Sequence, residues 1–154
     1  MFLLDFDSEF ANYDGRAVVA LGNPDTADRT GVVVPGITND LGNFGSTLEK
    51  AANLRHAVHR EYGLAAKTAT VAWLGYDTPQ SLIDGMDRRE AKDGARRLQS
   101  FLDSMGAARA AAGQKAGSIT VFGHSYGSST SALAVARGMK VDNLALVGSP
   151  LGRW

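Results

Sequence analysis

The sequence of 154 residues contains no cysteine. This absence excludes disulfides, thiolate metal sites and cysteine nucleophiles, and it leaves the redox compartment undecided. An excess of either charge is also lacking, because Lys plus Arg and Asp plus Glu both number 16. No basic tract is present to neutralise a phosphate backbone, so the sequence argues against nucleic acid as a partner.

Long hydrophobic runs are missing as well. The first ten residues, MFLLDFDSEF, have no basic region, and Asp5 and Asp7 interrupt their short apolar stretch. They predict neither a signal peptide nor a membrane span. We therefore expect a soluble chain, cytoplasmic by default, while secretion by another route or as part of a longer precursor stays open. The length is typical of one domain, and we expect residues 1–154 to form one.

Short segments rich in strand formers alternate with amphipathic helical patterns along the chain. The predicted strands cover residues 2–6, 16–21, 32–34, 68–74, 118–122 and 144–147. The predicted helices cover residues 46–62, 87–105 and 128–137. Because each crossover must return along the sheet, this alternation predicts an α/β fold with a mostly parallel sheet covered by helices on both faces, a three-layer α/β/α sandwich.

The segment VFGHSYGSST, residues 121–130, contains a Gly-x-Ser-x-Gly motif centred on Ser125. Gly123 and Gly127 leave room for a tight strand-to-helix turn that exposes the serine hydroxyl at the carboxyl edge of a parallel sheet. The motif alone is weak, because an ordinary turn with Ser125 near a helix N-cap fits it too. Its position after the fifth predicted strand and before a helix favours a nucleophile.

Backbone N–H groups near this turn are candidates for an oxyanion hole. Tyr126 follows the serine, and the N–H groups at the start of a helix point out of its end. A second donor normally comes from the loop after an earlier strand, and the loop in VVVPGITND suits this role because Gly36 lets the backbone turn. The N–H of Ile37 or of Thr38 is the predicted second donor.

Four sequence blocks resemble the α/β-hydrolase superfamily, in which the nucleophile elbow likewise follows the fifth strand. In order, and spanning residues 15–150, they are GRAVVALGNPDTADRTGVVVPG, VAWLGYDTP, VFGHSYGS and LALVGSP. More narrowly, the chain resembles an actinobacterial α/β-hydrolase family once catalogued as a domain of unknown function. The resemblance implies a serine hydrolase with a small-molecule, ester-like acyl substrate and no cofactor, with Ser125 as nucleophile and backbone donors near Gly36 and Tyr126.

The acid and the histidine of a catalytic triad are missing after Ser125. In this superfamily the acid and then the histidine follow the serine along the chain. Here no histidine follows Ser125, and the one acidic residue that does, Asp142, precedes its strand and so falls at the opposite edge of the sheet. Asp77, just past the fourth predicted strand, is a candidate acid on the correct edge, although aspartate is also typical of turns.

The three histidines do not suit the role of base. The side chain of His124, inside the motif, would leave the turn in a different direction from that of Ser125 and pack locally. His56 and His59 fall in the first predicted helix, where we expect surface or half-buried imidazoles. They are spaced for zinc, but no third ligand lies nearby in the sequence, so no metal site is predicted.

A serine without a base is a poor nucleophile. The sequence therefore predicts the N-terminal part of a hydrolase that ends after its sixth strand, as a truncated chain, a split gene product or a proteolytic fragment. A non-catalytic α/β module for binding or assembly is the alternative, whereas no glycine-rich phosphate-binding motif follows any strand. With residues 144–147 left as an uncovered edge, we expect self-association or a complementing chain there.

Overall fold

The computed structural model describes residues 1–11, 14–81, 83 and 88–149. The strands are β1 (Phe2–Asp7), β2 (Arg16–Leu21), β3 (Arg29–Val34), β4 (Thr68–Leu74), β5 (Ser118–His124) and β6 (Asn143–Val147). The helices are α1 (Phe44–Tyr62), α2 (Arg89–Ala111) and α3 (Tyr126–Ala136), and the short 3-10 helix η1 (Leu41–Asn43) precedes α1. The predicted order of strands and helices is confirmed.

The six strands form one mixed sheet in the order β1-β2-β4-β3-β5-β6. The strands β1 and β2 form an antiparallel pair, and β2 runs antiparallel to β4. The strands β4, β3, β5 and β6 are parallel to one another, which confirms the mostly parallel sheet. Because parallel strands end at the same edge, the loops after β3, β4 and β5 meet there.

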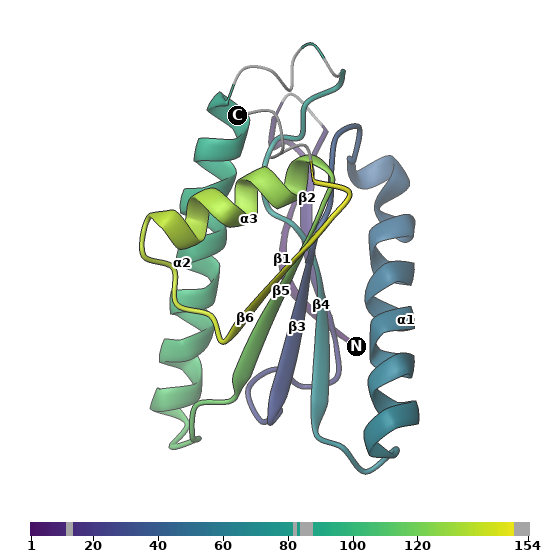
Figure 1. The fold of residues 1–154 in the computed structure, drawn as a ribbon, viewed down its shortest axis with the longest axis vertical. Helices are drawn as coiled ribbons and strands as arrows, with labels where there is room; N and C mark the ends of the chain where they lie inside the picture. The colour runs from purple at the N-terminus through teal and green to yellow at the C-terminus, as the bar shows by residue number, and fades with distance from the viewer. Residues whose placement is uncertain (12–13, 82, 84–87, 150–154) are drawn as a thin grey trace.

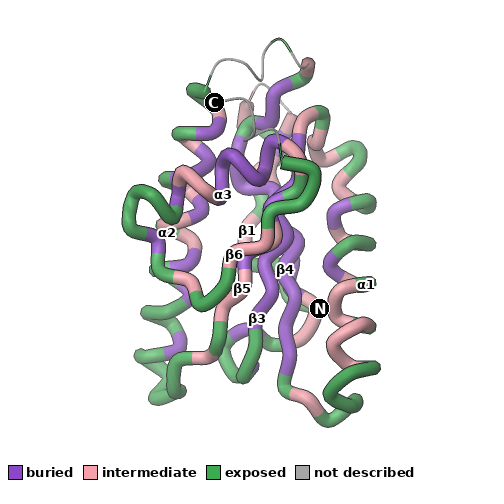
Figure 2. Tube along the Cα trace, viewed as in Figure 1, coloured by how far each residue is buried: buried purple, intermediate pink, exposed green. Residues whose placement is uncertain are grey.

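The sheet lies between two helical layers, with α1 on one face and α2 and α3 on the other (Figure 1). This arrangement is the predicted three-layer α/β/α architecture. Its central strands are buried on both faces, and every residue of β4 is buried. Figure 2 shows the same contrast between the buried central strands and the exposed outer surfaces of the helices.

The larger hydrophobic core fills the space between the sheet and the α2–α3 layer. In it the rings of Trp73 and Tyr76 stack with their centroids 5.8 Å apart, and Leu98 of α2 is fully buried. A smaller cluster of Val33, Ala51 and Ala72 lies under α1. The two clusters thus pack on opposite faces of the sheet.

Both edge strands expose apolar side chains. On β6, Leu146 is 38% exposed and Val147 is 55% exposed, and on β1, Leu3 is 66% exposed and Phe6 is 56% exposed. The placement of the last strand at an edge of the sheet agrees with the sequence analysis. In the described part of the chain, no helix combines the length and the apolar character needed to cross a bilayer.

Some element ends differ from the sequence prediction. The strand β5 continues to His124 and α3 begins at Tyr126, so a single residue separates them. The helix α2 runs to Ala111 instead of residue 105, because the alanine-rich sequence there keeps a high helix propensity after the apolar periodicity ends. The strand β3 begins at Arg29, since residues 29–31 pair with both neighbouring strands. The predicted helix start at residue 87 and the end of the last sequence block at residue 150 lie outside the described residues.

Candidate active site

Ser125 occupies the sharp turn between β5 and α3. Its φ of 53° and ψ of −123° lie outside the regions that residues with a side chain normally adopt, at a cost on the order of 1–3 kcal/mol. The N–H of Ser125 donates to the carbonyl oxygen of Val147 at 2.8 Å, and its own carbonyl accepts from the N–H of Ser128 at 2.9 Å. The strained turn is therefore held from β6 and from the first turn of α3.

Three glycines make this turn sterically possible. A Cβ on Gly123 would lie 2.7 Å from the carbonyl oxygen of Gly127, and a Cβ on Gly127 would overlap the carbonyl oxygens of Val34 and Pro35. A Cβ on Gly36 would lie 2.9 Å from the Cβ of Ser125 and 3.3 Å from its Oγ. The structure thus brings the loop after β3 directly against the serine, as the sequence predicted.

The two predicted second donors differ in the present geometry. The N–H of Thr38 donates to the carbonyl oxygen of Pro79 at 2.8 Å, so it is already used inside the loop. For the N–H of Ile37 there is no hydrogen-bond acceptor among residues 1–11, 14–81, 83 and 88–149. The geometry therefore favours Ile37 over Thr38 as a donor, together with Tyr126, the first residue of α3.

Side chains that the sequence analysis did not identify fix this loop. The Nδ2 of Asn39 donates to the carbonyl oxygens of Gly36 at 3.2 Å and of Ile37 at 2.9 Å. The Oγ1 of Thr78 accepts from the N–H of Asn39 at 3.0 Å and donates to its carbonyl oxygen at 2.7 Å. An asparagine that follows a glycine turn by three residues is a signal for such local bonds, but the partner Thr78 is 39 residues away.

Two buried tyrosines support the turn from the side of α2. The hydroxyl of Tyr76 donates to the carbonyl oxygen of Pro35 at 2.8 Å, and burial raises the pKa of Tyr76 far above its usual value, so the phenol stays neutral. The hydroxyl of Tyr126 accepts from the N–H of Ala91 at 3.2 Å. Tyr76 thereby positions the residue before Gly36, a role that nothing in its sequence context indicated.

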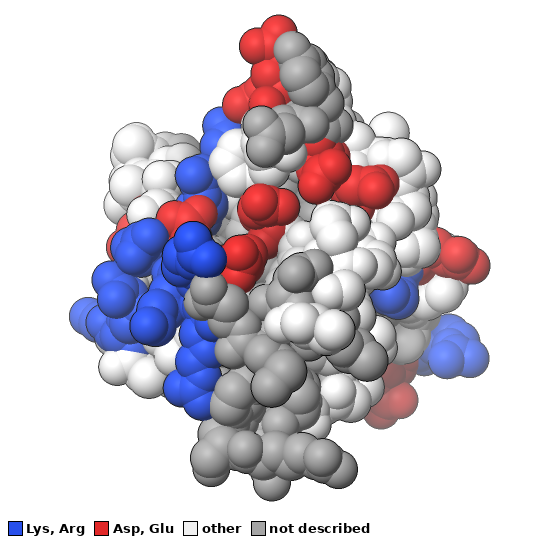
Figure 3. Space-filling view, turned by 90° about the horizontal axis from the view of Figure 1, so that it is seen from above, with Lys and Arg blue, Asp and Glu red and all other residues white. Residues whose placement is uncertain are grey.

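Asp77 lies among other carboxylates. Its pKa is raised by partial burial and by the negative charges of Asp14, Glu90 and Asp93. Figure 3, which views the molecule from above, shows acidic side chains gathered on this face beside a group of Lys and Arg. The groups that perturb Asp77 are acids and not an imidazole, so this geometry gives the predicted acid no histidine to orient.

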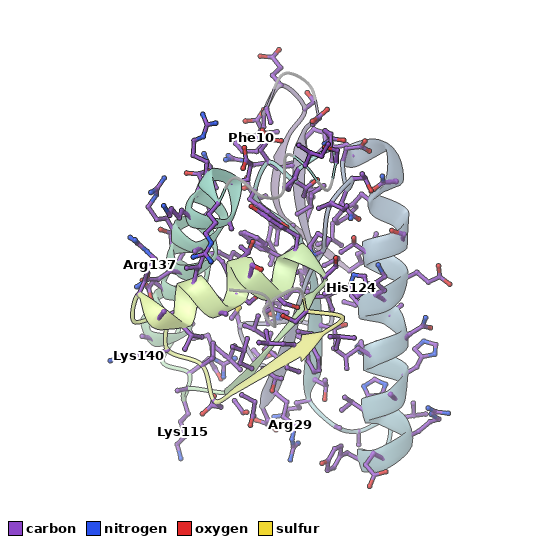
Figure 4. The ribbon with its side chains drawn as sticks, turned by 45° about the horizontal axis from the view of Figure 1, so that its top comes forward. Phe10, Arg29, Lys115, His124, Arg137 and Lys140 are labelled. Carbon is purple, nitrogen blue, oxygen red and sulfur yellow. The ribbon has the colours of Figure 1, made fainter. Side chains whose placement is uncertain are left out.

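None of the three histidines is hydrogen-bonded to the Ser125 hydroxyl. His124 ends β5, and Figure 4 shows it on the α1 side of the start of α3. Partial burial and the positive charge of Lys50 on α1 lower the pKa of His124. His56 and His59 line a surface cavity on the C-terminal half of α1 with Arg55, Arg60 and Leu64. This half points away from the edge where α1 begins after β3.

Asp142 is the acidic residue that follows Ser125 in the chain, and it lies at the opposite edge of the sheet. Its Oδ2 accepts from the N–H of Ile119 at 2.7 Å. Within the described ranges, His, Asp and Glu side chains form no group of three or more that could hold a metal ion. The described residues thus bring together a strained serine and backbone donors, and within them no hydrogen bond joins the Ser125 hydroxyl to a histidine or a carboxylate.

The chain is similar to one family model and to individual mycobacterial proteins. A family model described as alpha/beta hydrolase matches residues 11–153. Rv0963c, an uncharacterized protein of Mycobacterium tuberculosis strain H37Rv, is 35% identical over 140 residues, which cover 87% of this chain and 52% of that protein. Rv2079 of the same strain is 34% identical over 155 residues, which cover 97% of this chain and 23% of that protein. The chain therefore spans about half of the first relative and less of the second.

Proposed function

Since the chain belongs to the α/β-hydrolase family, we propose that it carries the nucleophile of a serine hydrolase that acts on carboxylic esters or related acyl compounds. The observation that supports this most directly is the backbone of Ser125, whose φ of 53° is kept between β5 and α3 while Gly36 packs against its side chain. A non-glycine residue in such a conformation is a costly feature that tends to occur at functional sites.

In the proposed reaction the Oγ of Ser125 attacks the acyl carbonyl carbon. A bond forms between Oγ and this carbon, and the carbonyl oxygen becomes an oxyanion that accepts hydrogen bonds from the N–H groups of Tyr126 and Ile37. The bond to the leaving alcohol then breaks, the alcohol takes up the serine proton through a base, and water hydrolyses the acyl-enzyme. Removal of one such donor typically costs about 10²- to 10³-fold in kcat.

The base is the part of this mechanism that the described residues do not supply. Because none of the three histidines is hydrogen-bonded to the Ser125 hydroxyl, we place the base on a histidine from outside residues 1–154. Asp77 stays a candidate acid, since it follows β4 at the same edge as the serine.

Labelling with a fluorophosphonate probe tests the nucleophile. The native protein here means the full-length protein that supplies the proposed base. In it we expect the probe to modify Ser125, and we expect the Ser125→Ala variant to remain unmodified. The matched control is Ser118→Ala, which removes an exposed serine at the other end of β5 and leaves labelling intact. Absence of labelling in the unaltered native protein would contradict the proposal.

Among the described residues no histidine or carboxylate is hydrogen-bonded to the Ser125 hydroxyl, which favours a second candidate function, a non-catalytic module for binding or assembly. In that case the elbow is retained for its fold alone. Turnover of a p-nitrophenyl ester by this chain, abolished by Ser125→Ala, would exclude this candidate. Absence of turnover in both this chain and the native protein would support it.

A further inference from the structure

A cavity of about 250 Å³ lies between the start of α2 and one face of α3. It is lined by Arg88, the residue before α2, by Ala91 of α2, and from α3 by Tyr126, Ser129, Ala132, Leu133 and Ala136. The lining residues of α3 recur every three or four positions, so a single face of the helix forms this wall. Figure 1 shows α3 running from the end of β5 toward α2, so the cavity extends away from the elbow along the helix.

The cavity begins next to the proposed nucleophile in the sequence. Its first lining residue on α3 is Tyr126, which directly follows Ser125. A group attached to the Oγ of Ser125 therefore starts at the same helix end as the cavity. A chain that continues along α3 would pass Ser129 and reach Ala132 one helical turn later.

The walls of the cavity are mainly apolar, and its polar lining residues are Arg88, Tyr126 and Ser129. Ser129 is only 5% exposed, and its Oγ has no hydrogen-bond partner among the described residues. The Oγ itself is inaccessible to solvent, so the open surface of the cavity along α3 is mostly that of apolar groups. By contrast, the cavity of about 470 Å³ between the β1–β2 pair and α2 is lined by the ion-paired side chains of Arg16, Arg97 and Asp93.

We propose that the cavity between α2 and α3 binds the aliphatic chain of the substrate's acyl group. This inference rests on the proposed serine hydrolase function. A methylene is close to a water molecule in size, at about 30 Å³, so the volume of about 250 Å³ corresponds to roughly eight carbon atoms. The substrate class is thus a medium-chain acyl ester.

A chain-length series of p-nitrophenyl esters in the native protein tests the cavity. Each buried methylene should raise kcat/KM about three- to fourfold up to roughly eight carbons, after which the increase stops. Ala132 is a half-buried lining residue, and the ring in Ala132→Trp would occupy the cavity. This variant should flatten the dependence of kcat/KM on chain length and lower the ratio of octanoate to acetate hydrolysis. Ala136→Trp at the exposed mouth replaces it if Ala132→Trp does not fold. The matched control, Ala108→Trp on the exposed surface of α2, should leave the series unchanged.

Binding of free octanoate to the Ser125→Ala variant, measured by calorimetry, tests whether the cavity binds an aliphatic chain and does not depend on hydrolysis. We expect the Kd to rise at least about tenfold when Ala132→Trp is added and to stay the same when Ala108→Trp is added, since several methylenes lose their site. Equal affinity in both tryptophan variants would overturn the inference. If no ester is hydrolysed and no probe labels Ser125, the proposed function fails while this measurement still stands.

A chain-length series that is identical in all variants, with hydrolysis still dependent on Ser125, rejects the cavity and keeps the proposed function.

Discussion

At Ser125 one residue connects a strand to a helix in a conformation that its neighbours must hold. The hydrogen bonds to Val147 and Ser128 fix its backbone, and Gly36 fills the space beside its side chain. Gly127 is equally constrained from the other side, because any Cβ there meets backbone carbonyl oxygens and not a flexible side chain. Small residues at these positions are thus a requirement of the backbone.

The substitution Gly127→Ala tests this requirement. Its new methyl group would overlap the carbonyl oxygens of Val34 and Pro35, so the free energy of unfolding should fall by about 1–3 kcal/mol. The control Gly106→Ala adds a methyl to a helical glycine of α2 with no atom within 4 Å, and it should raise stability by about 1 kcal/mol. Urea unfolding measures both. A Gly127→Ala midpoint equal to that of the unaltered chain would contradict the close packing.

The raised pKa of Asp77 predicts how the stability of the fold depends on pH. Its folded pKa is raised above the usual 3.8, so the folded state holds its proton more tightly than the unfolded state does. The stability from this group is present at low pH and is lost as the pH rises through the folded pKa. Asp77→Asn should therefore raise Tm modestly at pH 7 and leave it nearly unchanged near pH 3. A lower Tm at pH 7 in calorimetry would show that the carboxylate has a stabilising partner.

At the scale of elements, α2 is tied to two loops near its C-terminal end by Arg109. This side chain is 8% exposed, and its Nη1 and Nη2 donate to the carbonyl oxygens of Pro24 and Lys115, both at 2.6 Å. The two loops follow β2 and α2, so one side chain joins segments that the strand and helix patterns leave separate. Hydrogen bonds to a charged group are stronger than neutral ones.

Arg109→Met should lower the free energy of unfolding by about 2–3 kcal/mol, because two carbonyl groups lose charged donors. Arg96→Met is the matched control on the same helix. Its side chain is 56% exposed and pairs with Asp93 at the surface, so its loss should cost only about 0–1 kcal/mol. Guanidinium chloride unfolding compares the two variants. Equal losses would mean that the bonds of Arg109 add little.

The sequence predicted those elements whose signal is local. The strand TATVAWL was predicted with both ends correct, because its run of apolar and β-branched residues is bounded by turns. The final turns of α2 were not predicted, since alanines carry propensity without periodicity. The elbow and the Gly36 loop were predicted to meet, and they do. The bond that uses the Thr38 N–H joins it to Pro79, a contact across loops that no local pattern contains.

At the scale of the whole molecule, the sheet has an open edge at β6. The side chains of Leu146 and Val147 are exposed there, and among the described residues β6 pairs with β5 alone. Unpaired edges with apolar side chains favour pairing with another chain. The open edge also lies next to the elbow, because β6 pairs with β5 up to His124.

We therefore expect this chain to self-associate or to bind a complementing chain through β6. Val147→Lys places a charge on the exposed edge and should shift the population toward monomers in solution scattering. The control Val135→Lys changes a side chain that is 37% exposed on α3 and should leave the distribution unchanged. A monodisperse monomer for the unaltered chain would contradict this expectation.

The hydrogen bond from the Ser125 N–H to the Val147 carbonyl has a thermodynamic consequence. It ties the Ser125 turn to the last strand, so we expect a chain that pairs with β6 and shifts Val147 also to change the free energy of ligand binding at Ser125. Such coupling is reciprocal. A reversible boronate on Ser125 would then act as an effector of assembly, changing the affinity of the β6 edge by the same factor by which assembly changes the affinity for the boronate.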